Sequence, residues 1–402
     1  MMTRTSPTRR TAPAAFLACL VLLAIPLSAE QTRRLDKAFP VSPSTVLQFA
    51  NLAGEVEIVQ GSGGELKIEA TIHAEGGNAG ETQQLLSVME WVETHDRKGK
   101  PEWALSYPVA RYRSFAYPRI HDSGDDDGWL WNLLSSFNMG SHDNGYYLGK
   151  RVGVRGRSSA SVPVLYADLK ISLPGRGKVV VRNLVGDVEG GQLEGDLMVD
   201  TGSVEVTLAG FAGNLVVDTG SGDVRLGKVR GETLVDTGSG NVTIAELIGN
   251  GNLDTGSGDI EVERVAAGKL RTDTGSGNIT VKNGSVAALT GDTGSGDILV
   301  DNVEVETFEG DTGSGNVTLR SSLAEAREVR IDTGSGDVTI YAGPSAAFDL
   351  VASQGSGDLS CGYADATLRK QDGEVIGAER GNRQTRIVID TGSGDARIAP
   401  VR

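Results

Sequence analysis

The sequence predicts an all-β fold, a single-stranded parallel β-solenoid similar to a β-helix, with about ten to twelve coils of 18–21 residues. The first observation is the phrase Asp218–Val224 (DTGSGDV), which returns with little change until the C-terminus. The second is that apolar residues alternate on both sides of each copy, as in strands with one face in a core. The leading residues of the copies are Asp200, Asp218, Asp236, Asp254, Asp273, Asp292, Asp311, Asp332 and Asp390.

Each repeat can be numbered from its leading aspartate as position zero. Two degenerate copies, Arg182–Val188 and Ser353–Leu359, extend the register. Positions six and eight are apolar in all ten repeats from Asp200 onward, and residues two apart lie on one face of a strand. Positions minus three and minus one alternate likewise, as in Leu197 and Val199. We therefore expect these positions to line a continuous core.

This parity predicts the orientation of the phrase itself. Position zero points outward, the threonine at position one points inward, and Gly-Ser-Gly forms a corner, because glycine adopts positive φ angles and permits close approach of neighbouring coils. We expect the threonine hydroxyls to hydrogen-bond along their own column. Cys361 occupies position eight, so we expect it to be a small buried hydrophobe.

Position five alternates acid and amide after Glu205, from Asp223 and Asn241 through to Asn316 and Asp337. Carboxylates about 4.8 Å apart repel each other by about 1 kcal/mol when hydrated, whereas an intervening asparagine can donate its amide to both neighbours. In the position-zero column no asparagine separates the carboxylates, so their repulsion is not reduced in this way. Its carboxylates should either accept hydrogen bonds from turn N–H groups, as in Asx-turns, or be bridged by cations.

Residues 1–29 predict a signal peptide, because a basic start precedes an apolar run and Leu27–Ala29 suits cleavage before Glu30. We therefore expect an exported protein that stays in the periplasm, reaches the outer surface or is secreted. Cys19 fits a lipoprotein signal poorly. The apolar run is shorter than the ~20 residues of a membrane-spanning helix, so we expect no membrane span in the mature chain.

Three further segments are predicted. Residues 30–75 contain a first β-coil and a strand, residues 76–161 form an aromatic-, Gly- and Asp-rich insertion or cap, and residues 162–402 form the β-solenoid. Residues 81–94 fit either a short helix or a strand. Trp129 and Trp131 in the insertion are candidate ligand-binding residues that could stack on sugar rings, although large aromatics more often serve packing.

The formal net charge of −15 argues against nucleic acid and anionic lipid as partners, since both attract basic surfaces. It is compatible with cations and with polar glycans. Asp-Thr-Gly-Ser is also the catalytic phrase of aspartic proteases, but that chemistry needs one close pair of aspartates in a cleft and not nine copies at coil spacing.

Two functional alternatives remain open for the coils. The phrase has a loose likeness to calcium-binding β-roll repeats, which makes the position-zero column a candidate Ca²⁺ site; turn capping by the same residues is the simpler interpretation. Its members are Asp200, Asp218, Asp236, Asp254, Asp273, Asp292, Asp311 and Asp332. A carbohydrate-active lyase or hydrolase is the other alternative, although all four histidines lie outside the coils.

An exported chain with an early strand pair, an aromatic insertion and serial Asp-Thr-Gly-Ser-Gly-Asp-Val copies resembles the bacterial putative-adhesin family of β-strand-repeat domains, a domain of unknown function. The resemblance covers roughly residues 40–402. It implies a cell-envelope β-solenoid that is not an enzyme, carries no catalytic or cofactor-binding residues, and acts as a binding or scaffold module for a cell-surface glycan or protein.

Overall fold

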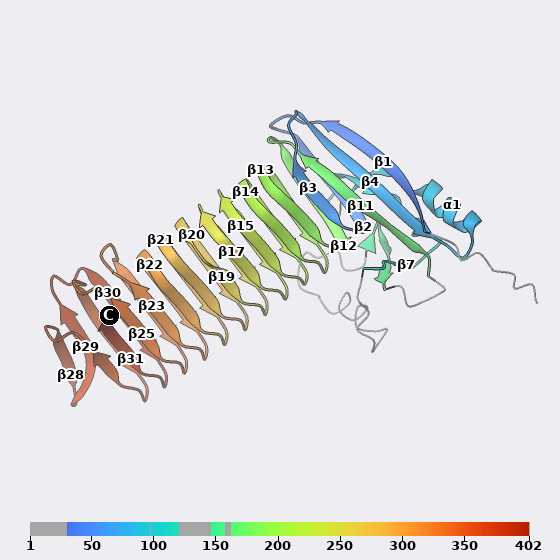
Figure 1. The fold of residues 1–402 in the computed structure, drawn as a ribbon. Coiled ribbons are helices and arrows are strands. Elements are labelled where there is room, and N and C mark those ends of the chain that lie inside the picture. The colour runs from blue at the N-terminus through green and yellow to red at the C-terminus, as the bar shows by residue number, and fades with distance from the viewer. Residues whose placement is uncertain (1–29, 97, 120–145, 157–161, 402) are drawn as a thin grey trace, which may run out of the picture.

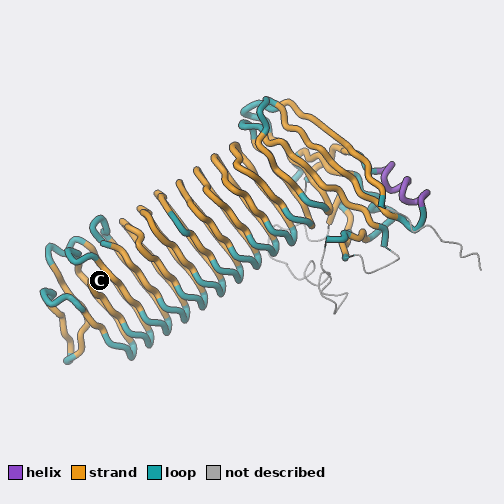
Figure 2. The backbone as a smooth tube through the Cα atoms, in the orientation of Figure 1, coloured by secondary structure: helices purple, strands orange, loops and turns teal. Residues whose placement is uncertain are grey.

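The computed structural model describes residues 30–96, 98–119, 146–156 and 162–401. These residues form an elongated stack of short strands, with a larger strand assembly at its N-terminal end (Figure 1). A regular row of corners connects the strands along one side of the stack (Figure 2). Every described strand except β8 and β9 belongs to one continuous hydrogen-bonded sheet, most of it parallel. The predicted all-β class is therefore confirmed.

The first arm of each coil runs up to the phrase and includes positions minus three to one. Neighbouring first arms pair in parallel and in register, so that Asp200 faces Asp218 and Asp311 faces Asp332. In spatial order these arms are β2 (Val46–Ala53), β12 (Lys178–Val185), β13 (Val188–Thr201), β14 (Val206–Thr219), β16 (Thr233–Thr237), β18 (Gly251–Thr255), β20 (Val265–Thr274), β21 (Ile279–Thr293), β22 (Ile298–Thr312), β24 (Glu328–Thr333), β30 (Thr385–Thr391) and β26 (Phe348–Gln354).

The second arm begins after the corner and carries positions six and eight. Several long strands bend and serve as the second arm of one coil and the first arm of the next. In spatial order the second arms are β3 (Val56–Gln60), the starts of β13 and β14, β15 (Val224–Arg230), β17 (Val242–Ile248), β19 (Ile260–Val262), the starts of β21 and β22, β23 (Val317–Ser321), β25 (Val338–Ala342), β31 (Ala396–Pro400) and β27 (Leu359–Cys361).

The core lies between the two arms, as the alternation predicts. Position-six residues such as Val242 and position-eight residues such as Ile244 are fully buried, and a third row that includes Leu247 closes the remaining side. Burial of each such side chain contributes about 1.5–3 kcal/mol before the entropy of ordering is subtracted. The prediction for Cys361 is wrong in degree: its side chain is only half-buried, because β27 is paired on one side alone.

The N-terminal assembly surrounds the first coil. β2 and β3 stack on the repeats through β12 and β13, while β11 (Val164–Leu173) lies on the outer side of β3. β4 (Glu65–Glu75) pairs antiparallel with β11 and with the edge strand β1 (Gln31–Pro40). The remaining strands here are β5 (Trp91–His95), β6 (Pro101–Leu105), β7 (Ser114–Ala116), β8 (Tyr146–Tyr147), β9 (Lys150–Arg151) and β10 (Gly153–Arg155).

The ambiguous stretch 81–94 contains both predicted elements. Helix α1 (Ala79–Val88) is followed by β5, which forms a hairpin with β6, and β6 pairs with β2. Asn78 caps the helix by accepting a hydrogen bond of 2.9 Å from the Glu81 amide, as N-cap residues do. At the other end, Arg33 donates to the carbonyl oxygen of Leu86 at 2.7 Å and so joins the helix to β1.

Trp91 and Trp103 of the insertion pack against the first coil and against β1. Trp103 lies beside Phe39 with ring centroids 5.4 Å apart, and Trp91 meets the edge of Phe49 at 6.2 Å. The ammonium of Lys37 sits 3.2 Å from the Trp103 ring centroid. These contacts match the packing interpretation of the aromatic residues.

No helix in the described ranges has the length and apolar character needed to cross a bilayer.

The C-terminal end departs from the order expected along the sequence. The copy led by Ser353 does not stack on the copy led by Asp332, because β30 and β31 lie between them. A hairpin of β28 (Thr367–Gln371) and β29 (Glu374–Arg380) then extends the sheet antiparallel to β26. The full phrase at Asp390 thus occupies an interior place with neighbours on both sides, and the degenerate phrase occupies the end.

Replacing Gly277 by alanine should disrupt stacking, because a Cβ there would lie 1.8 Å from the Gly258 carbonyl oxygen of the preceding coil. We expect a loss of about 2–3 kcal/mol in the free energy of unfolding, measured by equilibrium urea denaturation. The matched control is Gly191→Ala in β13, where a Cβ meets nothing within 4 Å and the change should stay within about 0.5 kcal/mol. Equal effects of the two substitutions would contradict this account of the corner.

Candidate functional site: the carboxylate columns at the coil corner

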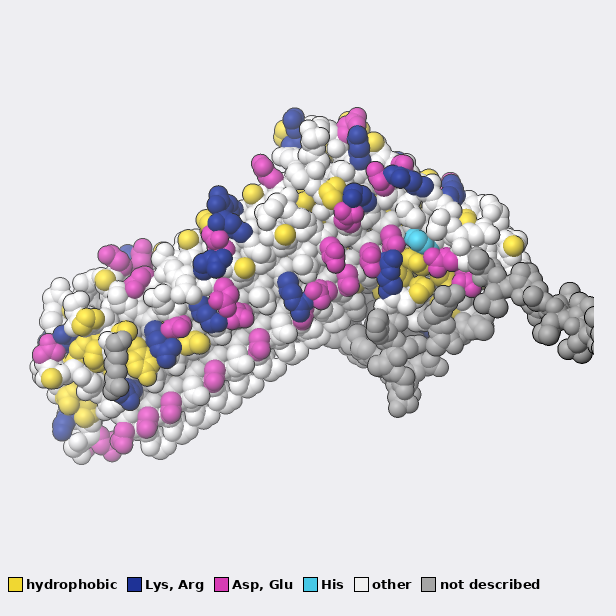
Figure 3. All heavy atoms as spheres, viewed as in Figure 1, with side chains coloured by type: hydrophobic (Ala, Val, Ile, Leu, Met, Phe, Trp, Pro, Cys, Tyr) yellow, Lys and Arg dark blue, Asp and Glu magenta, His cyan; other side chains and the backbone are white. Residues whose placement is uncertain are grey.

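The eight aspartates predicted as a candidate metal site form a single outward column. Successive first arms place each leading aspartate beside the next, and Asp390 continues the column after Asp332. Neighbours in such a parallel pairing are about 4.8 Å apart. The side chains are exposed or half-buried. Acidic side chains recur along the length of the stack (Figure 3).

The corner beneath this column is built from backbone. The position-one threonines are buried, but their hydroxyls do not bond to one another as predicted. The Thr274 hydroxyl accepts a hydrogen bond from the Gly277 amide at 3.1 Å and donates to the Gly258 carbonyl oxygen at 2.8 Å. The same pair of bonds recurs at Thr293 and Thr312. The hydroxyl therefore satisfies corner groups that water cannot reach.

Asparagine replaces threonine at position one in the first two coils. The Asn183 amide donates to the carbonyl oxygens of Gly54 at 2.8 Å and Gly186 at 2.7 Å, and the Asn51 amide donates to Asn183 Oδ1 at 3.0 Å. The Tyr107 hydroxyl then donates to Asn51 Oδ1 at 2.9 Å. A side chain from the insertion thus completes the buried polar column at its N-terminal end.

Position five caps the backbone of the following coil. Asp259 Oδ1 accepts from the Asn278 amide at 2.7 Å, and Asn278 Oδ1 accepts from the Asp297 amide at 3.0 Å. The side-chain amide of Asn278 donates to Asp259 at 3.2 Å and to no second acid among the described residues, so the predicted donation to both neighbours is wrong in that detail. The alternation still separates the charges of successive acids.

Five members of the position-zero column lack the turn capping expected there. In the described part of the chain, no corner amide donates to the carboxylates of five of its members. These are Asp236, Asp254, Asp292, Asp311 and Asp332. Ion pairs occur at Asp273, with Arg271 at 2.6 Å, and at Asp200, with Arg182 at 3.0 Å. The capping role belongs to position five instead.

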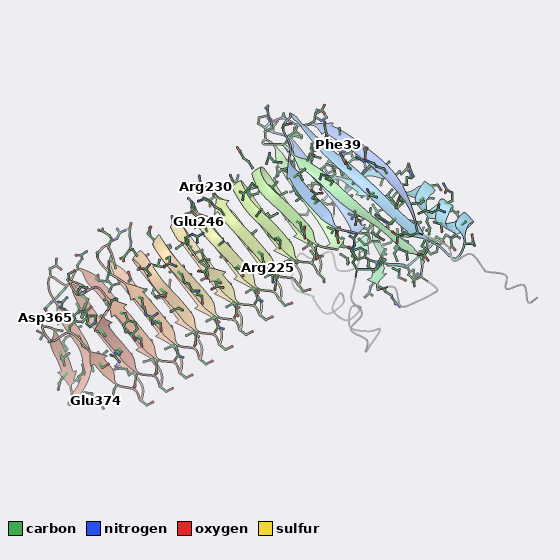
Figure 4. The ribbon with its side chains drawn as sticks, in the orientation of Figure 1. Phe39, Arg225, Arg230, Glu246, Asp365 and Glu374 are labelled. Atoms are coloured by element: carbon green, nitrogen blue, oxygen red, sulfur yellow. The ribbon has the colours of Figure 1, made fainter. Side chains whose placement is uncertain are left out.

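Position ten shows how this stack neutralises charge elsewhere. Lys228, Glu246 and Arg264 alternate in sign on successive coils, with the Lys228 ammonium 2.6 Å from Glu246. Arg225, which is labelled in Figure 4, pairs with Asp223 at 2.6 Å. The Lys228 hydrogen bond holds the pKa of Glu246 below its ordinary value. By contrast, the position-zero column repeats one sign of charge from coil to coil.

Partial burial and this repetition of charge raise the pKa of three members of the column. Partial burial raises the pKa of Asp254, Asp292 and Asp311, and the neighbouring carboxylates raise each of them further. For Asp254 the neighbours are Asp273 and Asp236. A carboxyl group whose pKa is raised favours protonation or an added cation over the free anion.

The column begins beside a cavity at the junction with the N-terminal assembly. Arg182 occupies position zero there, and its guanidinium bridges Asp200 and the buried Glu102, which is 2.6 Å away. The cavity has a volume of about 280 Å³ and is also lined by His95 and Tyr147. One guanidinium is thus shared by two carboxylates at this end of the column.

The other candidate residues have different outcomes. Trp129 and Trp131 lie outside the described residues. Within the described ranges, no group of three or more His, Cys, Asp or Glu side chains has an arrangement that could hold a metal ion. The predicted Ca²⁺ interpretation of the column stays a prediction, because single carboxylates spaced along a stack converge on no common point.

The structure also shows a charged cluster that sequence reasoning missed. His73 on β4 stacks on Tyr166 with ring centroids 4.5 Å apart, and its two ring nitrogens face Glu30 at 2.8 Å and Asp168 at 3.4 Å. Arg119 pairs with Asp168 at 3.2 Å. The hydrogen bond to Asp168 raises the pKa of His73 despite its partial burial. The partners are far apart in sequence, so no local motif signals them.

Residues 230–399 match the family model described as Toastrack DUF4097. The predicted resemblance to a putative-adhesin family of unknown function is thereby confirmed. The matched range includes the corners at Thr274, Thr293 and Thr312. No curated protein matches the chain.

Three solved structures match the chain over most of their length at low identity. A putative cell adhesion protein from Clostridium sporogenes ATCC 15579 is 10% identical, with 92% of this chain and 100% of that chain covered and a TM-score of 0.18. A putative lipid binding protein from Parabacteroides distasonis ATCC 8503 is 12% identical, with 91% and 96% covered and a TM-score of 0.30. A putative adhesin from Bacteroides fragilis NCTC 9343 is 10% identical, with 91% and 97% covered and a TM-score of 0.23. At these TM-scores the likenesses carry no further argument.

Replacing Asp254 by asparagine should stabilise the fold at pH 7 by about 1 kcal/mol, because it removes repulsion from two neighbouring carboxylates. A raised carboxyl pKa means that stability is present at acidic pH and is lost as pH rises through that pKa, so the gain should disappear at acidic pH. Thermal unfolding across pH and salt measures it. The control, Asp259→Asn, lies between two asparagines and should gain little; equal gains would contradict the repulsion.

Replacing His73 by glutamine should destabilise the fold most at acidic pH. Because the pKa of His73 is raised, its contribution is complete below the ordinary histidine pKa of 6.5 and is lost as pH rises through the raised pKa. We expect a loss of about 1.5 kcal/mol in the acidic range and convergence with the parent protein at alkaline pH. The control is His95→Gln at an exposed site of β5, and a pH-independent loss at His73 would contradict the ion-pair account.

Proposed function

We propose that the chain is an exported, non-catalytic β-solenoid of about ten to twelve coils that acts at the bacterial cell envelope as an adhesin-like binding or scaffold module. The observation that supports this proposal is the position-zero column, a row of carboxylates of one sign on a rigid stack. Such a surface attracts partners with positive charge and repels anionic ones. The partner class that fits is a cell-surface glycan with amino groups or a basic protein surface.

A binding role is preferred to catalysis because the coils repeat one chemistry. Hydrolytic and lyase sites need an acid and a base whose environments push their pKa values apart. The raised pKa values along the column share one direction and the same causes, which are partial burial and the neighbouring carboxylates, and no coil among the described residues breaks the pattern with a distinct acid–base pair. The described histidines, His73 and His95, lie outside the coils.

The proposal predicts salt-sensitive binding to an amino-bearing polysaccharide such as chitosan, with no binding to neutral dextran or anionic polygalacturonate. A triple variant that changes Asp254, Asp273 and Asp292 to asparagine should bind at least tenfold more weakly, a loss of about 1.4 kcal/mol. Biolayer interferometry with the three immobilised polymers measures this.

The control removes the same number of charges far from the column, at Glu57, Glu65 and Glu69, by substitution with glutamine. It should bind like the parent protein. Equal losses of affinity in both variants would show that the weaker binding follows from the change in net charge alone. The polymers are also assayed for new reducing ends and unsaturated products. Release of either product would support the carbohydrate-active enzyme instead.

A calcium-stabilised repeat protein is the second candidate, favoured by the raised pKa values of Asp254, Asp292 and Asp311. In this case the cation, and not a partner, offsets the repulsion along the column. The same variants therefore undergo thermal unfolding with millimolar Ca²⁺ and with chelator. A midpoint that Ca²⁺ raises in the parent but not in the triple variant supports this candidate, and an unchanged midpoint contradicts it.

A further inference from the structure

The cavity at the junction with the N-terminal assembly lies where the position-zero column ends. Strands β6, β2, β12 and β13 pair in parallel, so that Ala104, Ala50, Arg182 and Asp200 follow one another in register. The row of outward carboxylates therefore continues into one arginine and then two alanines. Because the side chain of alanine ends at Cβ, the two alanines leave space above the sheet, and both line the cavity.

A buried ion pair forms one wall of this cavity. Glu102 lies two residues before Ala104 on β6 and so projects from the same face, where its carboxylate is 2.6 Å from the Arg182 guanidinium. The Glu102 side chain is 8% exposed and that of Arg182 is 15% exposed. A buried ion pair recovers its desolvation cost only in part, so apolar side chains that filled the space would stabilise the fold at least as well. A fixed acceptor beside a fixed donor is instead an arrangement that orients a polar ligand.

The hairpin of β8 and β9 forms another wall. The Tyr147 hydroxyl donates to the carbonyl oxygens of Ala50 at 3.0 Å and Leu105 at 2.8 Å, which holds the hairpin against β2 and β6. The two turn residues both have positive φ, 49° at Leu148 and 72° at Gly149, and asparagine followed by glycine is the usual pair there. A leucine is strained in this conformation, and its side chain lines the cavity.

The size and charge of the cavity restrict the ligand. Its volume of about 280 Å³ is just below the ~300–1,000 Å³ of sites for drug-sized molecules, so it suits a single sugar ring. Leu148 and Leu184 supply apolar surface, and Thr94, His95 and the ion pair supply polar groups, which matches a ring with apolar faces and a polar edge. Because one guanidinium is shared by two carboxylates, the three groups together are negative and favour a cationic ring over an anionic one.

We propose that this cavity binds one amino-sugar ring of the glucosamine type, with the ammonium group of the sugar beside Glu102. The inference rests on the proposed binding of an amino-bearing glycan, and it names the place where one ring of that glycan is held. The position-zero column begins at Arg182 on the wall of the cavity, so the rest of a glycan chain has the aspartates beside it.

Three monosaccharides test the inference on the full chain by saturation-transfer NMR titration. Glucosamine should bind in the millimolar range, as a ligand of this size does, and roughly tenfold tighter than N-acetylglucosamine, which has the same ring without the charge. Glucuronate should not bind. Equal affinity for glucosamine and N-acetylglucosamine would overturn the place given to the ammonium group.

Substitutions in the cavity locate the binding. Thr94→Trp fills the cavity from β5 and should weaken glucosamine binding roughly tenfold or more, whereas Thr318→Trp on the outer face of β23 should not change it. Unchanged binding in Thr94→Trp would overturn the proposal. Thermal unfolding checks that each variant is folded, and Leu184→Trp replaces Thr94→Trp if the latter is not.

Glu102→Gln separates recognition of the charge from a structural effect. It keeps the shape of the cavity and should lower the affinity for glucosamine to that for N-acetylglucosamine, while the affinity for N-acetylglucosamine stays the same. A purely structural role of Glu102 would lower both affinities equally, and that result would contradict the proposal.

The cavity and the column can fail separately. The triple variant of Asp254, Asp273 and Asp292 leaves the cavity intact, so it should bind glucosamine like the parent protein while its binding to chitosan weakens. A parent protein that binds chitosan but not glucosamine would overturn the cavity inference alone. One that binds glucosamine but not chitosan would overturn the proposed function alone, and binding of neither would overturn both.

Discussion

The close stacking of one corner on the next is the constraint on which the structure depends. The Gly277 Cα lies so near the Gly258 carbonyl that no β-carbon fits, and the buried Thr274 hydroxyl bonds to the backbone of both coils. The number of residues per coil varies, but the strand register beside this corner pairs each leading aspartate with the next one throughout. A fixed corner is what aligns positions zero and five into straight columns, so the surface chemistry follows from backbone packing.

Once side chains of one type are aligned, their charges must be accommodated. The structure uses opposite charges at position ten and an acid–amide alternation at position five, where the oxygens also cap the next coil. Position zero has neither arrangement over most of its length, and partial burial together with the neighbouring carboxylates raises the pKa of Asp254. A uniform column that costs stability when ionised is consistent with a role outside folding, since an asparagine there would relieve the repulsion.

The features that recur in every coil could be predicted from the sequence, whereas most contacts that occur only once could not. The buried positions six and eight and the outward columns could be predicted because ten copies report the same environment. The threonine contacts could not, since a hydroxyl has equally suitable partners in its neighbours and in the backbone. The His73–Asp168 contact joins residues on β4 and β11, whose pairing depends on tertiary structure. The position of β30 was hidden because the same register fits either stacking order.

The two ends of the stack are closed on the same principle, by strands distant in sequence. At the N-terminal end β3 lies between β11 and β13, and the Asn51 amide donates to the Ala167 carbonyl oxygen at 2.8 Å. At the C-terminal end β26 lies between β30 and β29. An end coil held only by its sequence neighbour would fray and expose unpaired strand edges. Interleaving makes release of an end coil depend on release of a second segment, so the ends become cooperative units and not the weakest repeats.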